Sequence, residues 1–199
     1  MEKYFKVTTE SKLNLFGVTL FRLELTIDCK CGKSGDKGGW VESEFLKNGD
    51  ARVYGDAWVY GDAQVYGDAR VYGNAQVYGN ARVYGNAQVY GNARVYGNAR
   101  VSGDAQVYGD AWVYGNAQVY GNARVSGNAW EKSPLQIQGT KHFVNFCAKG
   151  KLQIGCKAFE LSFLLKNFKE IGKKEGYTDS EINEYELYIN LANSLCIHS

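Results

Sequence analysis

Few side chains in this sequence could carry out catalysis. His142 and His198 are the only histidines, so the chain cannot offer a zinc ion three imidazole ligands. His142 follows closely on a repetitive segment and is the only candidate for a general base in acyl transfer. A single exposed histidine is more often inert than catalytic. We therefore predict a protein without catalytic residues or enzyme activity.

The five cysteines form neither a disulfide framework nor a metal-binding pattern. Cys29 and Cys31 could supply two metal ligands, but the residues that separate them from Cys147 and Cys156 place the two pairs far apart. The stretch Gly32-Lys-Ser-Gly-Asp lacks the spacing of a phosphate-binding loop. An odd number of irregularly spaced thiols favours a reducing compartment. We predict a cytoplasmic protein with no metal and no cofactor.

The charge of the chain gives no general reason to bind a polyanion. There are 23 Lys and Arg residues against 21 Asp and Glu residues, which leaves a net charge of +2. A protein so close to neutral lacks the electrostatic field that attracts nucleic acid or an anionic membrane. No segment approaches the roughly 20 apolar residues that span a bilayer, and no secretory signal pattern is present. Neither a membrane nor nucleic acid is therefore an expected partner.

An internal repeat dominates the sequence and must position these side chains. Residues 49–126 are thirteen uninterrupted copies of the unit Gly-Asp/Asn-Ala-x-Val-Tyr/Ser. In an extended segment Ala and Val point to one side, while x and Tyr point to the other. Gly and Asn tolerate the left-handed backbone that a corner requires. Three units then form a triangular coil of about eighteen residues, and stacked coils bury a column of Ala and Val.

The repeat predicts a mainly β protein built on a left-handed parallel β-helix. The segment before it, residues 1–38, is expected to be β-structure, because apolar and polar residues alternate from Phe21 to Ile27. Leu135-Gln-Ile-Gln-Gly and Lys151-Leu-Gln-Ile-Gly resemble further repeat units. We therefore expect the β-helix to span residues 39–156, in about six coils.

Two amphipathic patterns predict a helical cap over residues 157–199. The first apolar stripe begins at Leu161 and ends before Gly172 and Gly176, and a capping box of Thr178 and Glu181 starts the second helix. The second helix is expected to bury a further stripe: Ile182, Tyr185, Tyr188, Ile189, Ala192 and Leu195. A plug for the open end of the β-helix is the simplest role for this pair. A partner-binding module is the alternative.

Residues eighteen positions apart should stack on one face of the β-helix. One face then carries a column that contains every tryptophan of the sequence: Trp40, Trp58, Gln76, Arg94, Trp112 and Trp130. Exposed tryptophan and arginine are the usual components of an interface hot spot. We predict a binding or self-association face centred on Arg94, Trp112 and Trp130. The alternative is that the amplified units drifted among Arg, Gln and Trp without selection.

The sequence resembles a known group of hexapeptide-repeat proteins. The resemblance rests on Gly38-Gly-Trp-Val-Glu, the Gly-Asn-Ala-Arg-Val-Tyr-Gly array and Ile154-Gly-Cys, and it runs from about Leu20 to Leu195. This group is common in tailed phages, prophages and enteric bacteria. The resemblance implies a left-handed β-helix of phage or bacterial origin, but no activity. More distantly, the repeat is similar to that of hexapeptide acyltransferases and γ-class carbonic anhydrases.

These observations favour a non-enzymatic scaffold that acts by protein–protein contact. We expect it to bind itself, as a trimer or dimer, and a bacterial host protein in the cytoplasm. The sharper hypothesis is an inhibitor of a bacterial defence system, such as an anti-CRISPR. One alternative is an acyltransferase-like enzyme that uses His142. The other is a nucleic-acid or nucleotide binder that uses Arg82, Arg100 and the tryptophan face.

Overall fold

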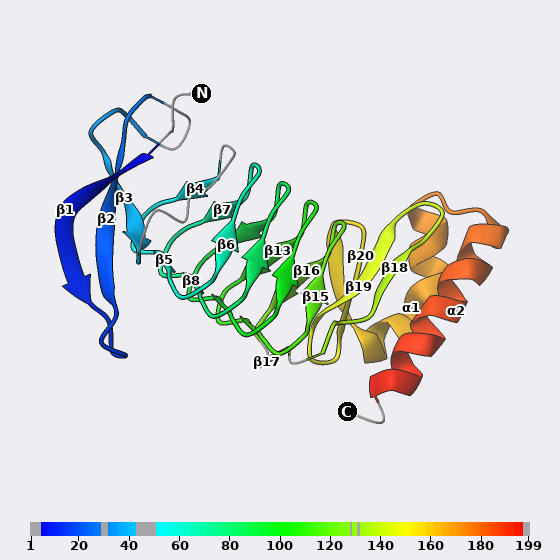
Figure 1. Cartoon of the computed structure of the whole chain (residues 1–199). Helices are drawn as coiled ribbons and strands as arrows, with labels where there is room; N and C mark the ends of the chain where they lie inside the picture. Colours follow the sequence, from blue (N-terminus) through cyan, green and yellow to red (C-terminus); the bar gives the residue numbers. More distant parts are fainter. Residues whose placement is uncertain (1–4, 29–31, 43–50, 128, 131, 197–199) are drawn as a thin grey trace.

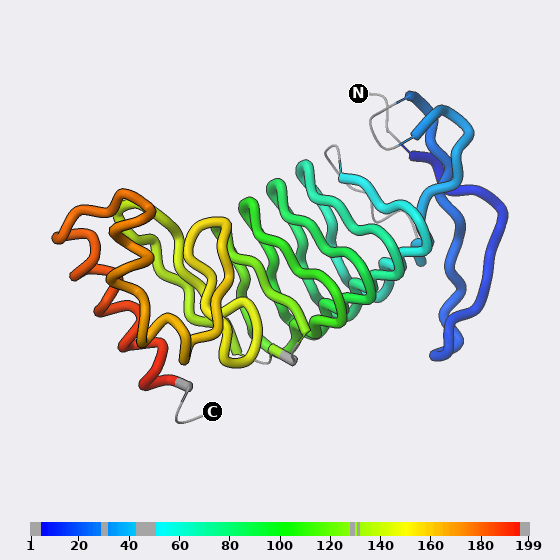
Figure 2. The backbone as a smooth tube through the Cα atoms, turned by 180° about the vertical axis from the view of Figure 1, so that it is seen from behind, coloured from blue at the N-terminus to red at the C-terminus, as the bar shows by residue number. Residues whose placement is uncertain are grey.

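The computed structural model describes residues 5–28, 32–42, 51–127, 129–130 and 132–196. The molecule is elongated, with a β-hairpin at one end, a stack of coils in the middle, and a small sheet with two helices at the other end (Figure 1). Seen from behind, the coils follow one another as similar turns of the chain (Figure 2). No described helix is long and apolar enough to cross a membrane.

The middle of the molecule is the predicted β-solenoid. Most units of the repeat contribute a strand of two or three residues: β4 Arg52–Val53, β5 Trp58–Val59, β6 Gln64–Val65, β7 Arg70–Val71, β8 Gln76–Val77, β9 Arg82–Val83, β10 Gln88–Val89, β11 Arg94–Val95, β12 Arg100–Val101, β13 Gln106–Tyr108, β14 Trp112–Val113, β15 Gln118–Val119 and β16 Arg124–Ser126. Every third strand pairs in parallel, as Gln88 does with Gln106, so one coil holds eighteen residues. The predicted coil length and parallel stacking are confirmed.

Between its two ends, the solenoid core consists of alanine and valine, as the repeat predicts. Ala57 and Val71 are typical members and have no exposed surface. Each corner carries a glycine at positive φ, and the corners stack closely. A Cβ atom built on Gly91, whose φ is +71°, would lie 3.0 Å from the backbone nitrogen of Gly109 in the next coil. Glycine is therefore required both by the backbone conformation and by the space available.

The solenoid ends sooner than the sequence predicts. After the last repeat strand, β17 (Ala129–Trp130), the chain leaves the coil and forms an antiparallel sheet: β18 Gln136–Gln138, β19 Phe143–Ala148, β20 Lys151–Ile154 and β21 Lys157–Glu160. Gly150 and Gly155, both at positive φ, form the tight turns between its last three strands. The expected extension of the β-helix to residue 156 is wrong, because alternating apolar residues suit an antiparallel strand as well as a solenoid strand.

Side chains from this sheet and its approach terminate the last coil. In the solenoid, the backbone N–H groups of the x and Tyr positions donate to carbonyls of the following coil, so these donors have no such backbone partner in the final coil. The N–H of Gln118 donates to Ser133 Oγ at 2.9 Å, and that of Tyr120 donates to Gln136 Oε1 at 2.8 Å. Buried Asn145 accepts from the N–H of Arg124 at 3.4 Å. Its amide also donates to the Arg124 carbonyl at 2.8 Å.

The two predicted C-terminal helices are present. Helix α1 (Leu161–Lys174) packs on the antiparallel sheet and on helix α2 (Asp179–Cys196). The capping box is confirmed, because the Thr178 N–H donates to Glu181 Oε2 at 2.7 Å and the Glu181 N–H donates to Thr178 Oγ1 at 3.2 Å. Leu195 was expected in the buried stripe, but it is 46% exposed.

The N-terminal segment extends one sheet of the solenoid. Strands β1 (Phe5–Leu13) and β2 (Thr19–Leu25) form a hairpin, and β2 pairs with β3 (Lys37–Val41), which in turn pairs in parallel with β5. The resulting sheet has the order β1-β2-β3-β5-β8-β11-β14-β17. The expected strand around Leu23 is confirmed. It ends at Leu25, and the apolar residue buried before Leu23 is Leu20, not Phe21.

Candidate functional site

The structure brings most of the predicted tryptophan column together. Along one solenoid sheet, Trp40 pairs with Trp58, and Trp58 pairs with Gln76. Arg94 follows next to Gln76 and pairs in turn with Trp112. We call the outer surface of strands β3, β5, β8, β11 and β14 the tryptophan face. Its two ends have different surroundings.

The N-terminal end of the tryptophan face is covered by the chain itself. Trp40 is only 7% exposed and packs with Leu20 of β2. The ammonium group of Lys12 lies 3.9 Å from the centre of the Trp40 ring and 4.6 Å from that of Trp58. These cation–π contacts place the hairpin over both indoles. Trp58, a predicted contact residue, is thus half-buried by an internal contact.

Trp130 does not belong to the tryptophan face. Strand β17 pairs with β14 one residue out of the eighteen-residue register, so that Trp130 lies opposite Val113 instead of Trp112. A slip of one residue turns a side chain to the other side of a strand. Trp130 therefore packs against the solenoid core and against the core of the C-terminal sheet and helices. The predicted place of Trp130 on the tryptophan face is wrong, and the partly buried indole lies at the end of the core at the last coil.

The exposed tryptophan of the tryptophan face is Trp112, which contacts the half-buried Arg94. The Arg94 guanidinium lies 4.9 Å from the centre of the Trp112 ring, and Trp112 is 42% exposed. Beside them, Tyr96 and Tyr114 stack with their ring centres 5.1 Å apart. This pair keeps the composition of an interface hot spot that the sequence predicts.

The predicted arginine pair lies on a different sheet. Arg82 and Arg100 are direct neighbours on strands β9 and β12, and both side chains are exposed. Within the part of the chain that the structure describes, neither guanidinium forms an ion pair with a carboxylate. Two adjacent cations suit a phosphate group, but a single pair is a small part of a nucleic-acid footprint. A role in nucleic-acid binding stays a prediction.

The most exposed apolar side chains lie where the sequence analysis did not place a site. Leu15 is 96% exposed, Phe16 is 75% exposed and Leu13 is 69% exposed, all at the turn between β1 and β2. We call this group the hairpin tip. A possible signal was the apolar run Leu13-Asn-Leu-Phe-Gly17, in which turn-forming residues flank apolar ones.

The hairpin tip has a defined conformation. The Asn14 side-chain oxygen accepts hydrogen bonds from the N–H groups of Phe16 and Val18, each at 2.9 Å. The Asn14 N–H donates to the Val18 carbonyl at 2.9 Å, and Gly17 adopts a φ of +77°. These local bonds close the turn without help from the apolar side chains. The tip therefore presents its leucine and phenylalanine side chains on an ordered frame.

His142 lies in the connection between β18 and β19, beside two cavities. A polar groove of about 600 Å³ runs from the solenoid corner at Asp68 and Asp104, past Arg124, to His142 and Cys156. In the described part of the chain, no side chain forms a hydrogen bond with the His142 ring. The backbone N–H of His142 donates to Tyr185 Oη at 2.5 Å. The imidazole therefore lacks the third group that orients a general base. Its proposed catalytic role stays a prediction.

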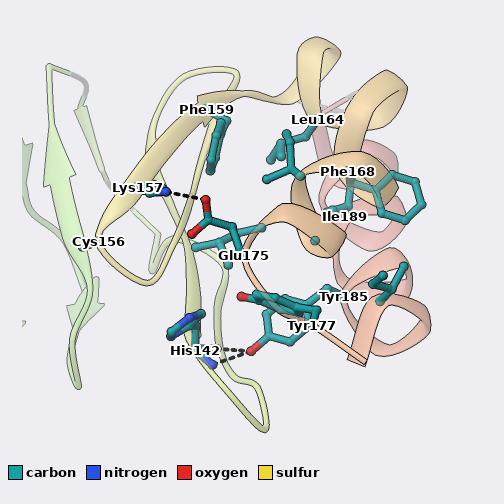
Figure 3. Close-up of a pocket in the computed structure, with 14 residues that line it drawn as sticks. His142, Cys156, Lys157, Phe159, Leu164, Phe168, Glu175, Tyr177, Tyr185 and Ile189 are labelled. Atoms are coloured by element: carbon teal, nitrogen blue, oxygen red, sulfur yellow. Dashed lines mark hydrogen bonds and ion pairs between the residues drawn. The ribbon is translucent and has the colours of Figure 1, made fainter. Parts of the chain in front are cut away.

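The second cavity lies between the antiparallel sheet and the two helices, and we call it the cap cavity (Figure 3). Its volume is about 90 Å³. Leu164 and Ile189 form its buried floor, whereas Phe159, Phe168 and Ile171 are half-buried walls. The rim is polar and contains Lys157, Glu175, Tyr177, His142 and Cys156. Residues 157–199 were expected to form a plug, and no cavity was predicted there from the sequence.

The described residues offer no obvious metal site. Among them, no three His, Cys, Asp or Glu side chains are close enough to hold a metal ion. Cys147 is buried, and burial raises the pKa of its thiol, whereas Cys156 is exposed. The candidate ligands Cys29 and Cys31, together with His198, lie outside the described residues.

Comparison with known proteins identifies the repeat. The model of a family described as the YdcK β-solenoid repeat matches six segments of the chain: residues 63–77, 75–91, 87–103, 93–109, 105–119 and 117–132. These segments lie in the solenoid between β6 and β17 and cover about a third of the chain. None of the curated proteins compared with the sequence matches it.

Proposed function

We propose that this chain, whose residues 63–132 carry β-solenoid repeats of the YdcK family, is a non-enzymatic scaffold that binds another protein through its hairpin tip. The observation that carries the proposal is the exposure of Leu15 and Phe16, at 96% and 75%. Contiguous apolar side chains at a protruding turn are unfavourable in water. Such groups are retained at the surface mainly where a partner covers them.

The conformation of the tip supports this role. Because Asn14 and Gly17 hold the turn, little conformational entropy is lost when a partner covers Leu15 and Phe16. The hairpin is also continuous with the sheet that carries the tryptophan face. Arg94 and Trp112 lie on that same sheet, two and three strand spacings beyond Trp58, or ~10 Å and ~14 Å. We propose Arg94 and Trp112 as a second contact on the same rigid support.

The class of partner follows from the sequence resemblance. Because proteins with this array are common in phages, prophages and enteric bacteria, the proposed partner is a bacterial host protein in the cytoplasm. Inhibition of a defence system, as by an anti-CRISPR protein, is the sharper form of the proposal. The scaffold is further proposed to associate with itself as a trimer or dimer.

The test is affinity capture from a bacterial lysate with the tagged full chain. Four proteins are compared: the wild type, the tip variant Leu15→Ser/Phe16→Ser, Trp112→Ala and the control Leu187→Ser. Leu187 is also a strongly exposed leucine, at 69%, but it lies on α2 at the opposite end of the molecule. The wild type and the control are expected to retain one host protein in stoichiometric amount. The tip variant should lose it, and Trp112→Ala should weaken its retention.

Retention of the same protein by the tip variant would contradict the proposed contact. Sedimentation of the four purified proteins then tests self-association separately from host binding. If the wild type is an oligomer and the tip variant is a monomer, the tip contacts a second copy of the chain. An oligomer that persists in both the tip variant and Trp112→Ala would show that neither surface mediates assembly.

The acyltransferase alternative rests on the place of His142 at the end of the polar groove of about 600 Å³. Acetyl-CoA is the natural probe, because acyl transfer requires an acyl donor to bind next to the base. Saturable binding of acetyl-CoA by the wild type, lost in His142→Ala, would favour this alternative over the scaffold. Absence of binding to the wild type would eliminate it.

A further inference from the structure

The cap cavity differs from the rest of the interior in exposing apolar walls. The solenoid core is closed, whereas Phe159, Phe168 and Ile171 remain half-exposed around the cavity although Leu164 beneath them is buried. An apolar pocket bordered by a few convergent polar groups is the usual form of a small-molecule site. The volume of about 90 Å³ limits the occupant to at most one six-membered ring, since a dry cavity of ~150 Å³ binds benzene.

The charges at the rim already have partners. Lys157 Nζ lies 2.6 Å from Glu175 Oε1, and this ion pair joins the β20–β21 hairpin to the end of α1 (Figure 3). Lys141 Nζ donates to the Gly176 carbonyl at 2.7 Å and lies 3.8 Å from Glu181 Oε2. A charged ligand would have to separate one of these pairs or lie next to an unbalanced charge. A neutral ligand meets no such cost.

One hydrogen-bond donor at the rim is available to a neutral ligand. The Tyr177 ring packs edge-on against Tyr185, with ring centres 5.1 Å apart, and lies 5.8 Å from the His142 ring. Within the described part of the chain, the Tyr177 hydroxyl has no hydrogen-bond partner, whereas the Tyr185 hydroxyl donates to the His142 carbonyl. Burial raises the pKa of Tyr177 to about 12, so its hydroxyl stays a neutral donor at physiological pH.

We propose that the cap cavity binds a small neutral molecule with one ring or branched aliphatic group and a single hydroxyl, such as a phenol or cyclic alcohol. The apolar part occupies the space between Phe159, Phe168 and Leu164. The hydroxyl oxygen accepts a hydrogen bond from Tyr177. The hydroxyl group of the ligand donates a hydrogen bond to Glu175. The hydrogen bond from Lys157 lowers the pKa of Glu175, so this carboxylate is an ionised acceptor. The site is distinct from the hairpin tip, which lies at the other end of the molecule.

Isothermal titration of the full chain with phenol, benzene and benzoate tests the size and the neutrality of the ligand. Phenol should bind saturably at one site. Benzene lacks the hydroxyl and therefore both of its hydrogen bonds, and it should bind at least ~10-fold more weakly. Benzoate is expected to bind more weakly than phenol, because its negative charge would separate an ion pair at the rim or lie next to an unbalanced charge. No saturable binding of phenol, or tighter binding of benzoate, would overturn the proposal.

Two pairs of variants locate the site. Ile171→Trp places a larger side chain at the cavity wall and should abolish phenol binding, whereas Leu187→Trp adds the same indole on the exposed face of α2 and should not. Tyr177→Phe keeps the ring and should weaken phenol about tenfold with no change for benzene. Tyr188→Phe, which removes a hydroxyl bound to Glu184, is its control. Unchanged phenol binding in folded Ile171→Trp would show that the ligand binds elsewhere.

Discussion

The solenoid and the C-terminal region are packed in different ways, although one chain joins them directly. The solenoid core uses two small residue types, and members such as Val77 and Ala93 are completely buried. The C-terminal core combines Leu, Ile, Phe and Tyr, and several of these side chains stay half-exposed around a cavity. Repetition closes a core because each coil repeats the shape of the preceding one. The cap cavity lies where the sequence does not repeat.

The two regions also satisfy their backbone groups differently. Inside the solenoid, each strand is bonded to the next coil by the backbone, and each unit has the same partners. At the junction, the partners are three unique side chains, those of Ser133, Gln136 and Asn145. A unit of the repeat can be exchanged for its neighbours, but a capping side chain cannot. This difference determines the expected size of the effects of mutation.

The largest effect is expected at Asn145, whose replacement would break the junction. Asn145→Leu keeps the approximate volume but leaves the N–H and carbonyl of Arg124 without their partner. Unpaired buried groups of this kind cost ~1–3 kcal/mol each, so we expect the free energy of unfolding to fall by ~2–4 kcal/mol. Hydrogen exchange should accelerate first in β15 and β16. Urea unfolding and amide exchange measure the two effects.

The control for this prediction is Asn122→Leu, at an exposed corner of the last coil. Exposed substitutions usually change stability by less than ~0.5 kcal/mol. Equal losses in the two variants would show that the junction is no more sensitive than the coil corners.

A smaller effect is expected from adding a methyl group at the corner glycines. Gly91 and Gly127 have φ values of +71° and +65°, so alanine is strained at both, by ~1 kcal/mol. Only at Gly91 would the new Cβ press on a backbone atom, at 3.0 Å, whereas no described atom lies within 4 Å at Gly127. We expect Gly91→Ala to lower the midpoint of urea unfolding more than Gly127→Ala does. Equal shifts would mean that the positive φ alone accounts for the loss of stability when alanine replaces a corner glycine.

The smallest effect on stability is expected from the titration of Tyr60 at high pH. Burial, followed by the neighbouring Tyr78, raises the pKa of Tyr60 to about 12. Because the pKa of Tyr60 in the folded state lies above the unfolded value of about 10, the protonated hydroxyl contributes its full stabilisation of the folded state below pH 10. It is then lost as the pH rises through 12, because the unfolded state releases its proton first. Tyr60→Phe should lose less stability over this interval than the wild type. Unfolding followed at several alkaline pH values gives the comparison, and a parallel loss in both proteins would contradict it.

Much of the solenoid could be predicted from the sequence because its determinants are local and repeated. The period of six fixes which side chains point inwards, and a glycine at each corner meets the positive φ at the turn. The capping box at Thr178 is equally local, since its two hydrogen bonds join residues three positions apart. Each of these features depends on neighbours in the chain or on an identical neighbour in the next coil.

Tertiary structure alone decided which of the predicted surface residues are accessible. The periodicity places Trp58, Trp112 and Trp130 in one column, but the hairpin covers the first and a slip of one residue in β17 turns the last inwards. Neither contact can be predicted from the sequence of the repeat, because each depends on how a non-repetitive segment docks on the solenoid. The same reason applies to the hairpin tip and the cap cavity. The sequence by itself determined the coil, and the packing of its two ends determined which side chains and cavities are accessible there.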